Sequence, residues 1–154
     1  MGSIEPVELL LRLGCAALLG AVLGLDRELR GKPMGLRTLT LISMGSALFT
    51  LTALELVAID GDPDNTGRIL QGVIAGIGVV GVGVILHQGR TLRLATTGAC
   101  VWLIGGVGIA SGLGLYLLAA ATTAITLLVL VLFGFLERHV IGDDAGGAQT
   151  PPDD

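Results

Sequence analysis

The chain has 154 residues, of which 52% are hydrophobic and only 14% are charged, and its mean hydropathy is +0.83. Soluble domains carry about 25% charged residues, so this chain has too little polar surface to cover a water-soluble body. Its net charge of −4 says little about partners, but the lack of a pattern of basic and aromatic residues, with aromatics at only 3%, argues against a nucleic-acid-binding surface. The composition therefore indicates an integral membrane protein.

Five apolar runs are each long enough to cross a bilayer, which takes about 17–25 mostly apolar residues in a helix. The first run is not a secretory signal, because Glu5 and Glu8 precede or open it and no basic residue does. We predict an all-α integral membrane protein, a compact bundle of five transmembrane helices over residues 1–138 with a disordered cytoplasmic tail over 139–154. The spans are expected at about 7–25, 39–59, 69–86, 94–111 and 115–136.

Basic residues concentrate in the hairpin between the first two spans. Four of the nine Lys and Arg residues lie there, namely Arg27, Arg30, Lys32 and Arg37. With five spans, this hairpin lies on the same side as the basic third loop and the C-terminal end, whereas the loop over 60–65 on the other side is acidic. Since Lys and Arg in short loops stay in the cytoplasm, we predict the N-terminus outside and the C-terminus in the cytoplasm.

The same hairpin holds the candidate functional charges. If the first helix continues past Gly24, Arg27 and Glu28 face the protein interior at the membrane surface. Poorly solvated charges there need partners, and Arg37 is available for Glu28. We take Arg27, Glu28 and Arg37 as a functional charge cluster; topology anchoring and lipid binding by basic residues remain the alternative. Other polar groups could extend the cluster, namely Asp26, Thr38, Arg93, Thr96 and Thr97. For the two threonines, capping of the fourth helix is the alternative.

The acidic loop is a weak candidate for a divalent cation. Asp60, Asp62 and Asp64 alternate as in the opening of an EF-hand loop. However, Asn65 stands where that loop needs Gly, and Gln71 stands where it needs the bidentate Glu. A solvated acidic loop is therefore the favoured interpretation, and we predict no cofactor, with Mg²⁺ left as the weak alternative.

The 25 glycines predict close helix packing, because small residues let helix backbones approach in a membrane. The segment 76–81 reads G-x-G-x-x-G, but it lies inside a predicted transmembrane helix and not at a strand-to-helix turn, so packing and not dinucleotide binding is expected. Small residues on two faces of the third span predict that this helix is central, while the fifth span lies at the periphery. The glycines expected to pack helices are Gly20, Gly24, Gly72, Gly76, Gly78, Gly81 and Gly83.

Several short motifs, in order, resemble the membrane domain of the MgtC/SapB family. They read GLDRE over 24–28, GLRT over 35–38, a glycine-rich helix over 76–85, two threonines at 96–97 and GLGLY over 112–116. The resemblance covers nearly everything from Leu9 to Arg138. The chain differs from the usual pattern at Leu39, where the family often has His, and at 94–95, where it usually has Gly-Leu. We expect the short form, without the soluble domain that many members carry after the last span.

The resemblance implies a multi-pass protein of the bacterial inner membrane that is linked to adaptation to low Mg²⁺. Some members are virulence factors, and one is reported to restrain the proton-driven ATP synthase. Two functions stay open: a non-enzymatic regulator that binds a membrane partner such as an ATPase or transporter, and a small homo-oligomeric transporter or channel for Mg²⁺ or another ion. The scarcity of polar groups at mid-bilayer favours the regulator. No nucleophile–base pair or phosphate-binding loop suggests an enzyme.

Overall fold

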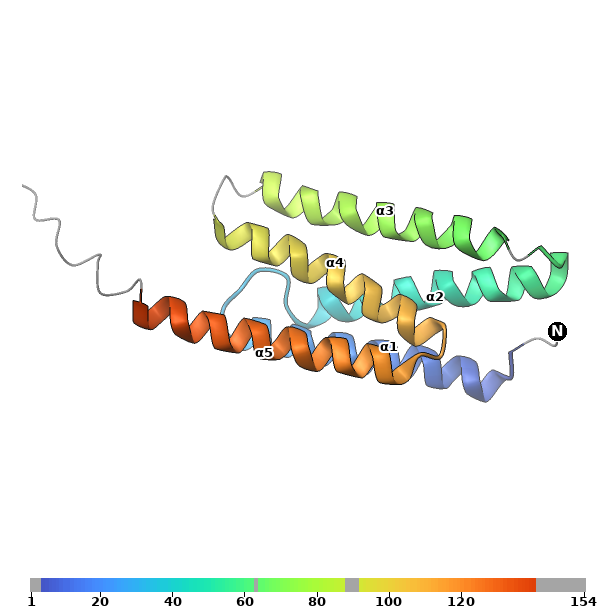
Figure 1. Ribbon diagram of the computed structural model, residues 1–154, viewed down its shortest axis with the longest axis horizontal. Helices are drawn as coiled ribbons and strands as arrows, with labels where there is room; N and C mark the ends of the chain where they lie inside the picture. Colours follow the sequence, from blue (N-terminus) through green and yellow to red (C-terminus); the bar gives the residue numbers. More distant parts are fainter. Residues whose placement is uncertain (1–3, 63, 88–91, 141–154) are drawn as a thin grey trace, which may run out of the picture.

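The computed structural model describes the backbone of residues 4–62, 64–87 and 92–140, and the side chains of 4–59, 61–62, 64–84 and 95–136. It has five helices, α1 (Pro6–Leu29), α2 (Leu36–Asp60), α3 (Asp64–His87), α4 (Leu92–Gly112) and α5 (Tyr116–Val140), which run lengthwise beside one another (Figure 1). All five are long and apolar enough to cross a membrane. The predicted all-α, five-span architecture is confirmed.

The helices extend a few residues beyond the predicted spans because polar residues continue them past the apolar core. Thus α1 includes Asp26 to Leu29. At the other end of the chain, α5 runs through Val140. The first two residues of the predicted tail are therefore helical, and residues 141–154 lie outside the described residues.

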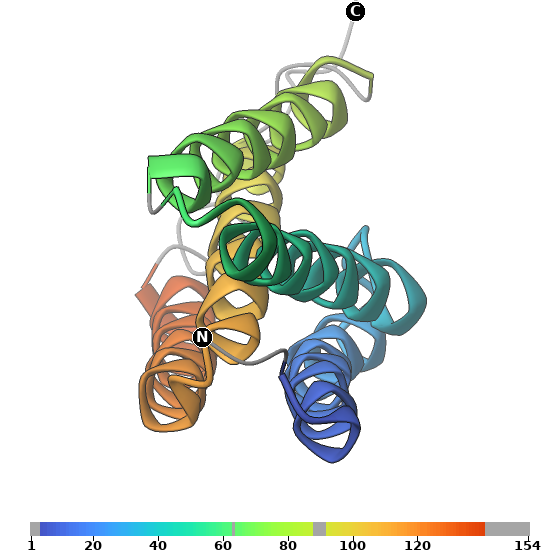
Figure 2. The same ribbon diagram turned by 90° about the vertical axis from the view of Figure 1, so that its right-hand side faces the viewer.

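The centre of the bundle is α4 and not α3. In Figure 2, α4 lies between the other helices, and it contacts all four of them. Of its membrane-spanning segment 61% is buried, compared with 6% for α3. The prediction that the third span is central is wrong, because among the five described helices α3 packs against α2 and α4 alone. The peripheral position predicted for the fifth span is confirmed by its contacts, which involve α4 and α1.

Glycines bring α1, α2 and α4 into backbone contact. A Cβ at Gly108 of α4 would overlap the carbonyl oxygen of Ser43, and one at Gly20 of α1 would lie 2.9 Å from the carbonyl oxygen of Leu39. Such close approach is possible only without side chains at these positions. The opposing surface on α2 consists of small residues, each of which is buried: Ser43, Ser46, Ala47, Thr50 and Ala53.

Most glycines of α3 do not pack against the rest of the chain. A Cβ at Gly81 would lie 3.3 Å from the carbonyl oxygen of Gly98. The other four predicted packing positions of this helix meet no atom within 4 Å: Gly72, Gly76, Gly78 and Gly83. The prediction that these four glycines pack against other helices of the same chain is wrong. The physical reason is that Ile77 fills the contact with α4 above Gly105, whereas Gly72 and Gly76 line an open groove between α3 and α2.

Candidate functional site

Arg27 is a buried cation in the last turn of α1, with 3% of its surface exposed. Its Nη2 donates to Thr97 Oγ1 at 2.7 Å, its Nη1 to Cys100 Sγ at 3.3 Å, and its Nε and Nη2 both donate to the carbonyl oxygen of Pro33. Among the described side chains no carboxylate pairs with it. The guanidinium therefore ties α1 to α4 and to the loop over residues 30–35, using neutral acceptors alone.

Glu28 was predicted to face the protein interior, but it is exposed. That prediction is wrong. Its Oε2 accepts a hydrogen bond from the backbone N of Leu36 at 2.8 Å. That amide opens α2 and has no partner within the helix, so Glu28 caps α2 and places a negative charge at the positive end of its dipole. The predicted ion pair with Arg37 is absent from the described residues, and Arg37 is exposed.

The 30–35 loop explains why these two charges separate. Lys32 N donates to the carbonyl of Arg27, and Gly31 N donates to that of Glu28, each at 3.0 Å. Gly31 has a φ of +61°, and the two bonds form a Schellman motif that ends α1. The reversed chain then crosses so close to α1 that a Cβ at Gly24 would lie 2.7 Å from Leu36 Cα. Arg27 holds this loop from inside and Glu28 holds it from outside.

The remaining candidates divide in the same way. Thr97 is buried and accepts from Arg27, whereas Thr96 is exposed and Thr38 is half-buried. Asp26 accepts from Arg30 Nε through Oδ1 at 2.8 Å, and its Oδ2 is buried without a hydrogen bond. The side chain of Arg93 lies outside the described residues.

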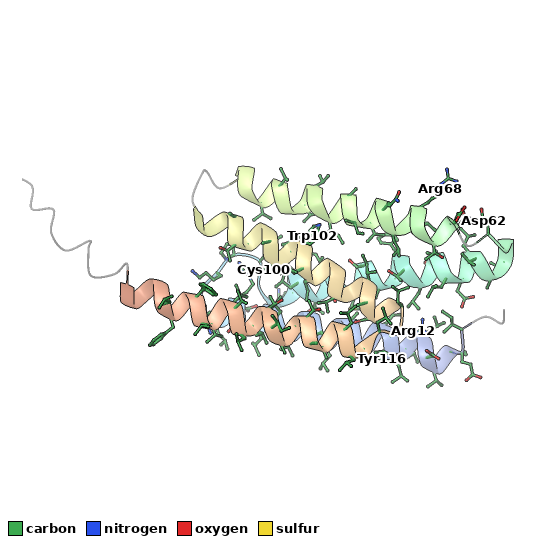
Figure 3. The ribbon with its side chains drawn as sticks, viewed as in Figure 1. Arg12, Asp62, Arg68, Cys100, Trp102 and Tyr116 are labelled. Atoms are coloured by element: carbon green, nitrogen blue, oxygen red, sulfur yellow. The ribbon has the colours of Figure 1, made fainter. Side chains whose placement is uncertain are left out.

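Sequence reasoning missed two acceptors of the buried cation, Cys100 and the Pro33 carbonyl. Cys100, labelled on α4 in Figure 3, follows Thr97 by three residues. Positions three apart share a helix face. This spacing was the available signal, because it places a thiol beside any group that reaches Thr97.

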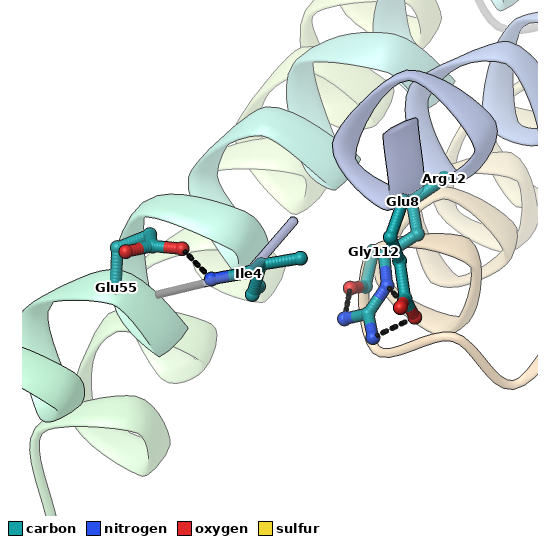
Figure 4. Close-up of polar contacts among 5 residues, drawn as sticks. All are labelled: Ile4, Glu8, Arg12, Glu55 and Gly112. Atoms are coloured by element: carbon teal, nitrogen blue, oxygen red, sulfur yellow. Dashed lines mark hydrogen bonds and ion pairs between the residues drawn. The ribbon is translucent and has the colours of Figure 1, made fainter. Parts of the chain in front are cut away.

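The sequence analysis also missed a polar site that connects α1 to α4 at the opposite end of the bundle. Arg12 donates from Nη1 to the carbonyl oxygen of Gly112 at 2.9 Å and pairs with Glu8 Oε1 at 2.6 Å (Figure 4). Gly112 is the last residue of α4, where carbonyls lack helical partners and a cation is favoured. The four-residue spacing of Glu8 and Arg12 signalled this pair. Beside it, Ile4 N donates to Glu55 Oε1 at 2.7 Å, which ties the N-terminal segment to α2 (Figure 4).

The acidic loop gains no support as a metal site. The backbone N of Asp64 donates to Asp62 Oδ1 at 3.0 Å, which is a local turn, and the side chain of Asp60 lies outside the described residues. Across the described part of the chain, no three His, Cys, Asp or Glu residues are grouped to hold a metal ion.

Two grooves on the bundle surface are apolar. One of about 450 Å³ lies between α2 and α3 and is lined by residues such as Phe49, Gly72 and Gly76. The other, of about 310 Å³, lies over α4 between α3 and α5, beside Trp102 and Gly106. Neither groove offers a charged side chain to a ligand.

Comparison with known proteins agrees with the resemblance of the motifs. The model of the MgtC family matches residues 13–139. Protein MgtC of Salmonella typhimurium (strain LT2) is 38% identical over 123 residues, which cover 80% of this chain and 51% of that protein. Protein SrpB of Synechococcus elongatus is 39% identical over 140 residues, covering 82% of this chain and 75% of SrpB.

A third relative, YhiD of Escherichia coli (strain K12), whose name gives it as a candidate magnesium transporter, is 36% identical over 130 residues, covering 82% of this chain and 60% of YhiD. The chain spans about half the length of the MgtC proteins it matches. No solved structure matches it. The extent of the family match and the identity to several relatives show that the chain belongs to the MgtC family.

Proposed function

We propose that this chain is a non-enzymatic regulator of the bacterial inner membrane that acts in adaptation to low magnesium by binding a membrane ATPase or transporter. The observation that carries the proposal is the set of polar side chains that the bundle buries, which among the described residues comprises Arg27 and hydroxyls but no carboxylate. Five of the hydroxyls donate to a carbonyl one turn earlier on their own helix: Ser46 to Ile42, Thr50 to Ser46, Ser111 to Val107, Thr123 to Ala119 and Thr126 to Thr122. Thr97 accepts from Arg27, and the hydroxyl of Ser43 is buried without a hydrogen bond.

An ion path needs polar groups that are free to replace water around the ion. No carboxylate is buried among the described residues, and the two surface grooves are apolar, so one chain offers a divalent cation few strong ligands. Among the described residues, Arg27 is the only charged side chain that is buried. Its positive charge repels a cation. Mg²⁺ in particular dehydrates reluctantly. These features support a regulator over a conduction path through a single chain.

The exposed basic residues at the 30–35 end suggest where a partner binds. Lys32 and Arg37 are both exposed, and neither forms an ion pair within the described residues. Arg27 and Glu28, by contrast, are engaged by the loop. Of the three residues in the predicted charge cluster, Arg37 is therefore the one available to a partner protein or to an anionic lipid headgroup.

Transport of Mg²⁺ or another ion is the second candidate function. The name of YhiD favours it, and the open face of α3 leaves room for a path between copies of the chain. The distinguishing experiment is Mg²⁺ uptake into proteoliposomes of the purified chain, followed with an entrapped Mg²⁺-sensitive dye. We expect no uptake above that of empty liposomes from protein shown to be folded and inserted. Saturable uptake that Arg37→Ala abolishes would overturn the regulator.

A complementary experiment tests the partner. ATP-driven proton pumping is measured in inverted bacterial membrane vesicles that contain the wild-type chain, Arg37→Ala or Lys32→Ala at equal levels. We expect the wild type and Lys32→Ala to lower pumping and Arg37→Ala to lose this effect. Unchanged pumping with the wild type would exclude the proton-driven ATPase as the partner, and equal behaviour of the two variants would exclude a specific role for Arg37.

A further inference from the structure

The first two turns of α3 carry two opposite charges that do not pair with each other. Asp64 and Arg68 are four residues apart and exposed, and at this spacing acidic and basic side chains on a helix can form an ion pair. The same spacing produces both ion pairs of α1, with N···O distances of 2.6 and 2.8 Å. Among the described residues, neither Asp64 nor Arg68 has an ion-pair partner. Both charges are therefore available to a ligand.

A polar pocket of about 410 Å³ lies between these charges and is lined by Asp64, Gly67, Arg68 and Gln71. A Cβ at Gly67 would meet no atom within 4 Å, so the missing side chain at this position keeps the floor of the pocket open. Figure 3 shows Arg68 pointing away from the bundle. The pocket therefore presents a carboxylate, a guanidinium and an amide to the surroundings of the protein and not to its core.

The pocket lies at the end of a membrane span, where lipid headgroups are found. The part of α3 that can cross a membrane runs from Asp64 to Val84. After Gln71, the same side of the helix continues with exposed apolar residues one turn apart, Ala75 and Val79. Headgroups surround the ends of a transmembrane helix, and acyl chains surround its apolar part. One phospholipid can therefore contact both the pocket and the apolar surface beside it.

The two charges indicate a headgroup that carries both signs. A phosphate is attracted to Arg68, but a headgroup with only negative charge would also meet the carboxylate of Asp64. Asp62 adds a further negative charge here, and its Oδ1 accepts from the backbone N of Asp64 at 3.0 Å. A primary ammonium group donates hydrogen bonds to a carboxylate, whereas the trimethylammonium group of choline has no N–H to donate. The pattern fits phosphoethanolamine.

We propose that this pocket binds the headgroup of phosphatidylethanolamine. The ammonium group of the lipid binds Asp64, its phosphate binds Arg68, and the amide of Gln71 donates to the phosphate. The acyl chains lie along Ala75 and Val79. Each exposed charge contact is weak alone, so selectivity comes from the requirement for both charges at once. The lipid site does not depend on the regulatory role proposed above.

Quenching of tryptophan fluorescence by brominated phospholipids measures which lipid occupies the site. Trp102, the only tryptophan of the chain, is replaced by Phe, and Ala75→Trp places a reporter one turn from Gln71. Leu128→Trp, on an exposed part of α5, is the matched control. The protein is reconstituted into vesicles of phosphatidylcholine that contain increasing fractions of brominated phosphatidylethanolamine.

We expect the binding constant of phosphatidylethanolamine relative to phosphatidylcholine to be about fivefold higher at Ala75→Trp than at Leu128→Trp, as two exposed charge contacts allow. Equal relative constants at the two positions would overturn the proposal. A higher constant for brominated phosphatidylglycerol than for phosphatidylethanolamine at Ala75→Trp would also overturn it, because the site would then select negative charge.

Three variants of the Ala75→Trp protein test the pocket itself, each checked for wild-type helical content by circular dichroism. Asp64→Asn and Arg68→Gln should each reduce the preference for phosphatidylethanolamine, and Gly67→Leu should abolish it by filling the pocket. Gly83→Leu on the same helix, where a Cβ also has no atom within 4 Å, should leave it unchanged. An unchanged preference in the three pocket variants would contradict the proposal.

A soluble headgroup separates a lipid site from a site for free phosphoethanolamine. Glycerophosphoethanolamine has the same headgroup without acyl chains, and it should not relieve the quenching at Ala75→Trp, because the contacts with the apolar side of α3 are missing. Relief of the quenching at Ala75→Trp but not at Leu128→Trp would assign the pocket to a soluble ligand and overturn the lipid site.

Discussion

Replacing Arg27 by Lys tests whether its shape, and not only its charge, holds the 30–35 loop. Arg27 reaches Pro33, Thr97 and Cys100 at once because its donors form a planar fork. A lysine ammonium lacks this fork and keeps its charge buried. Loss of two of these hydrogen bonds, at about 1.5 kcal/mol each for a charged donor, costs about 3 kcal/mol. The loop should then open about a hundredfold more often, since each 1.4 kcal/mol is a factor of ten.

Limited trypsin digestion measures this opening, because Arg30 lies in the loop. In sealed membrane vesicles that expose the loop, cleavage after Arg30 should be about a hundredfold faster in Arg27→Lys than in the wild type, provided that opening is rapid compared with cleavage. Arg37→Lys is the matched control, because Arg37 is exposed and unpaired among the described residues. Wild-type cleavage of Arg27→Lys, or equal acceleration in Arg37→Lys, would refute the role assigned to the guanidinium.

Three other predictions concern the packing of Gly108, the cap of α2 and the orientation of the chain in the membrane. Gly108→Ala should lower the free energy of unfolding of the detergent-purified protein by about 1–3 kcal/mol through overpacking, because the new Cβ would overlap the Ser43 carbonyl. Gly45→Ala is the control and should not lower it, since a Cβ at Gly45 has nothing within 4 Å. Glu28→Ala should remove the α2 cap at about 1 kcal/mol and speed hydrogen exchange of the Leu36 amide about fivefold; an unchanged rate would exclude capping. In intact spheroplasts, Asp62→Cys should react with a membrane-impermeant maleimide and Lys32→Cys should not, as the predicted orientation requires; the reverse pattern would contradict it.

The helices could be predicted from the sequence because length and apolar composition determine them locally. The same is true of the face of α2, where Ser43, Ala47 and Thr50 follow helical spacing and are all buried. The place of α3 could not be predicted this way. A glycine-bearing face has the same pattern whether it packs within a chain or against another molecule, and only the fit of α2 against Gly108 and Gly112 decides that α4 takes the centre.

The predicted cluster of Arg27, Glu28 and Arg37 was wrong for a different reason. Helical spacing placed Arg27 and Glu28 on one side of α1, but it does not describe the backbone that follows the helix. The Schellman turn at Gly31 brings the Pro33 carbonyl and the Leu36 amide back over the last turn of α1. Arg27 therefore bonds a backbone carbonyl and neutral side chains of α4, and Glu28 bonds a backbone amide in place of the predicted ion pair with Arg37.

The different surroundings of these charges separate residues with a structural role from a residue available for function, within the short segment from Gly24 to Arg37. Arg27 and Glu28 bond the loop from its two sides, with Gly24 and Gly31 providing the space and the turn. Loss of either charge would therefore disturb the loop whatever the protein does, and an inactive Arg27 variant alone would say little about function. Arg37 carries the same charge on the surface, with no described partner to lose. A functional defect in Arg37→Ala at normal membrane levels, with the trypsin sensitivity of the wild type, would therefore report on binding and not on folding.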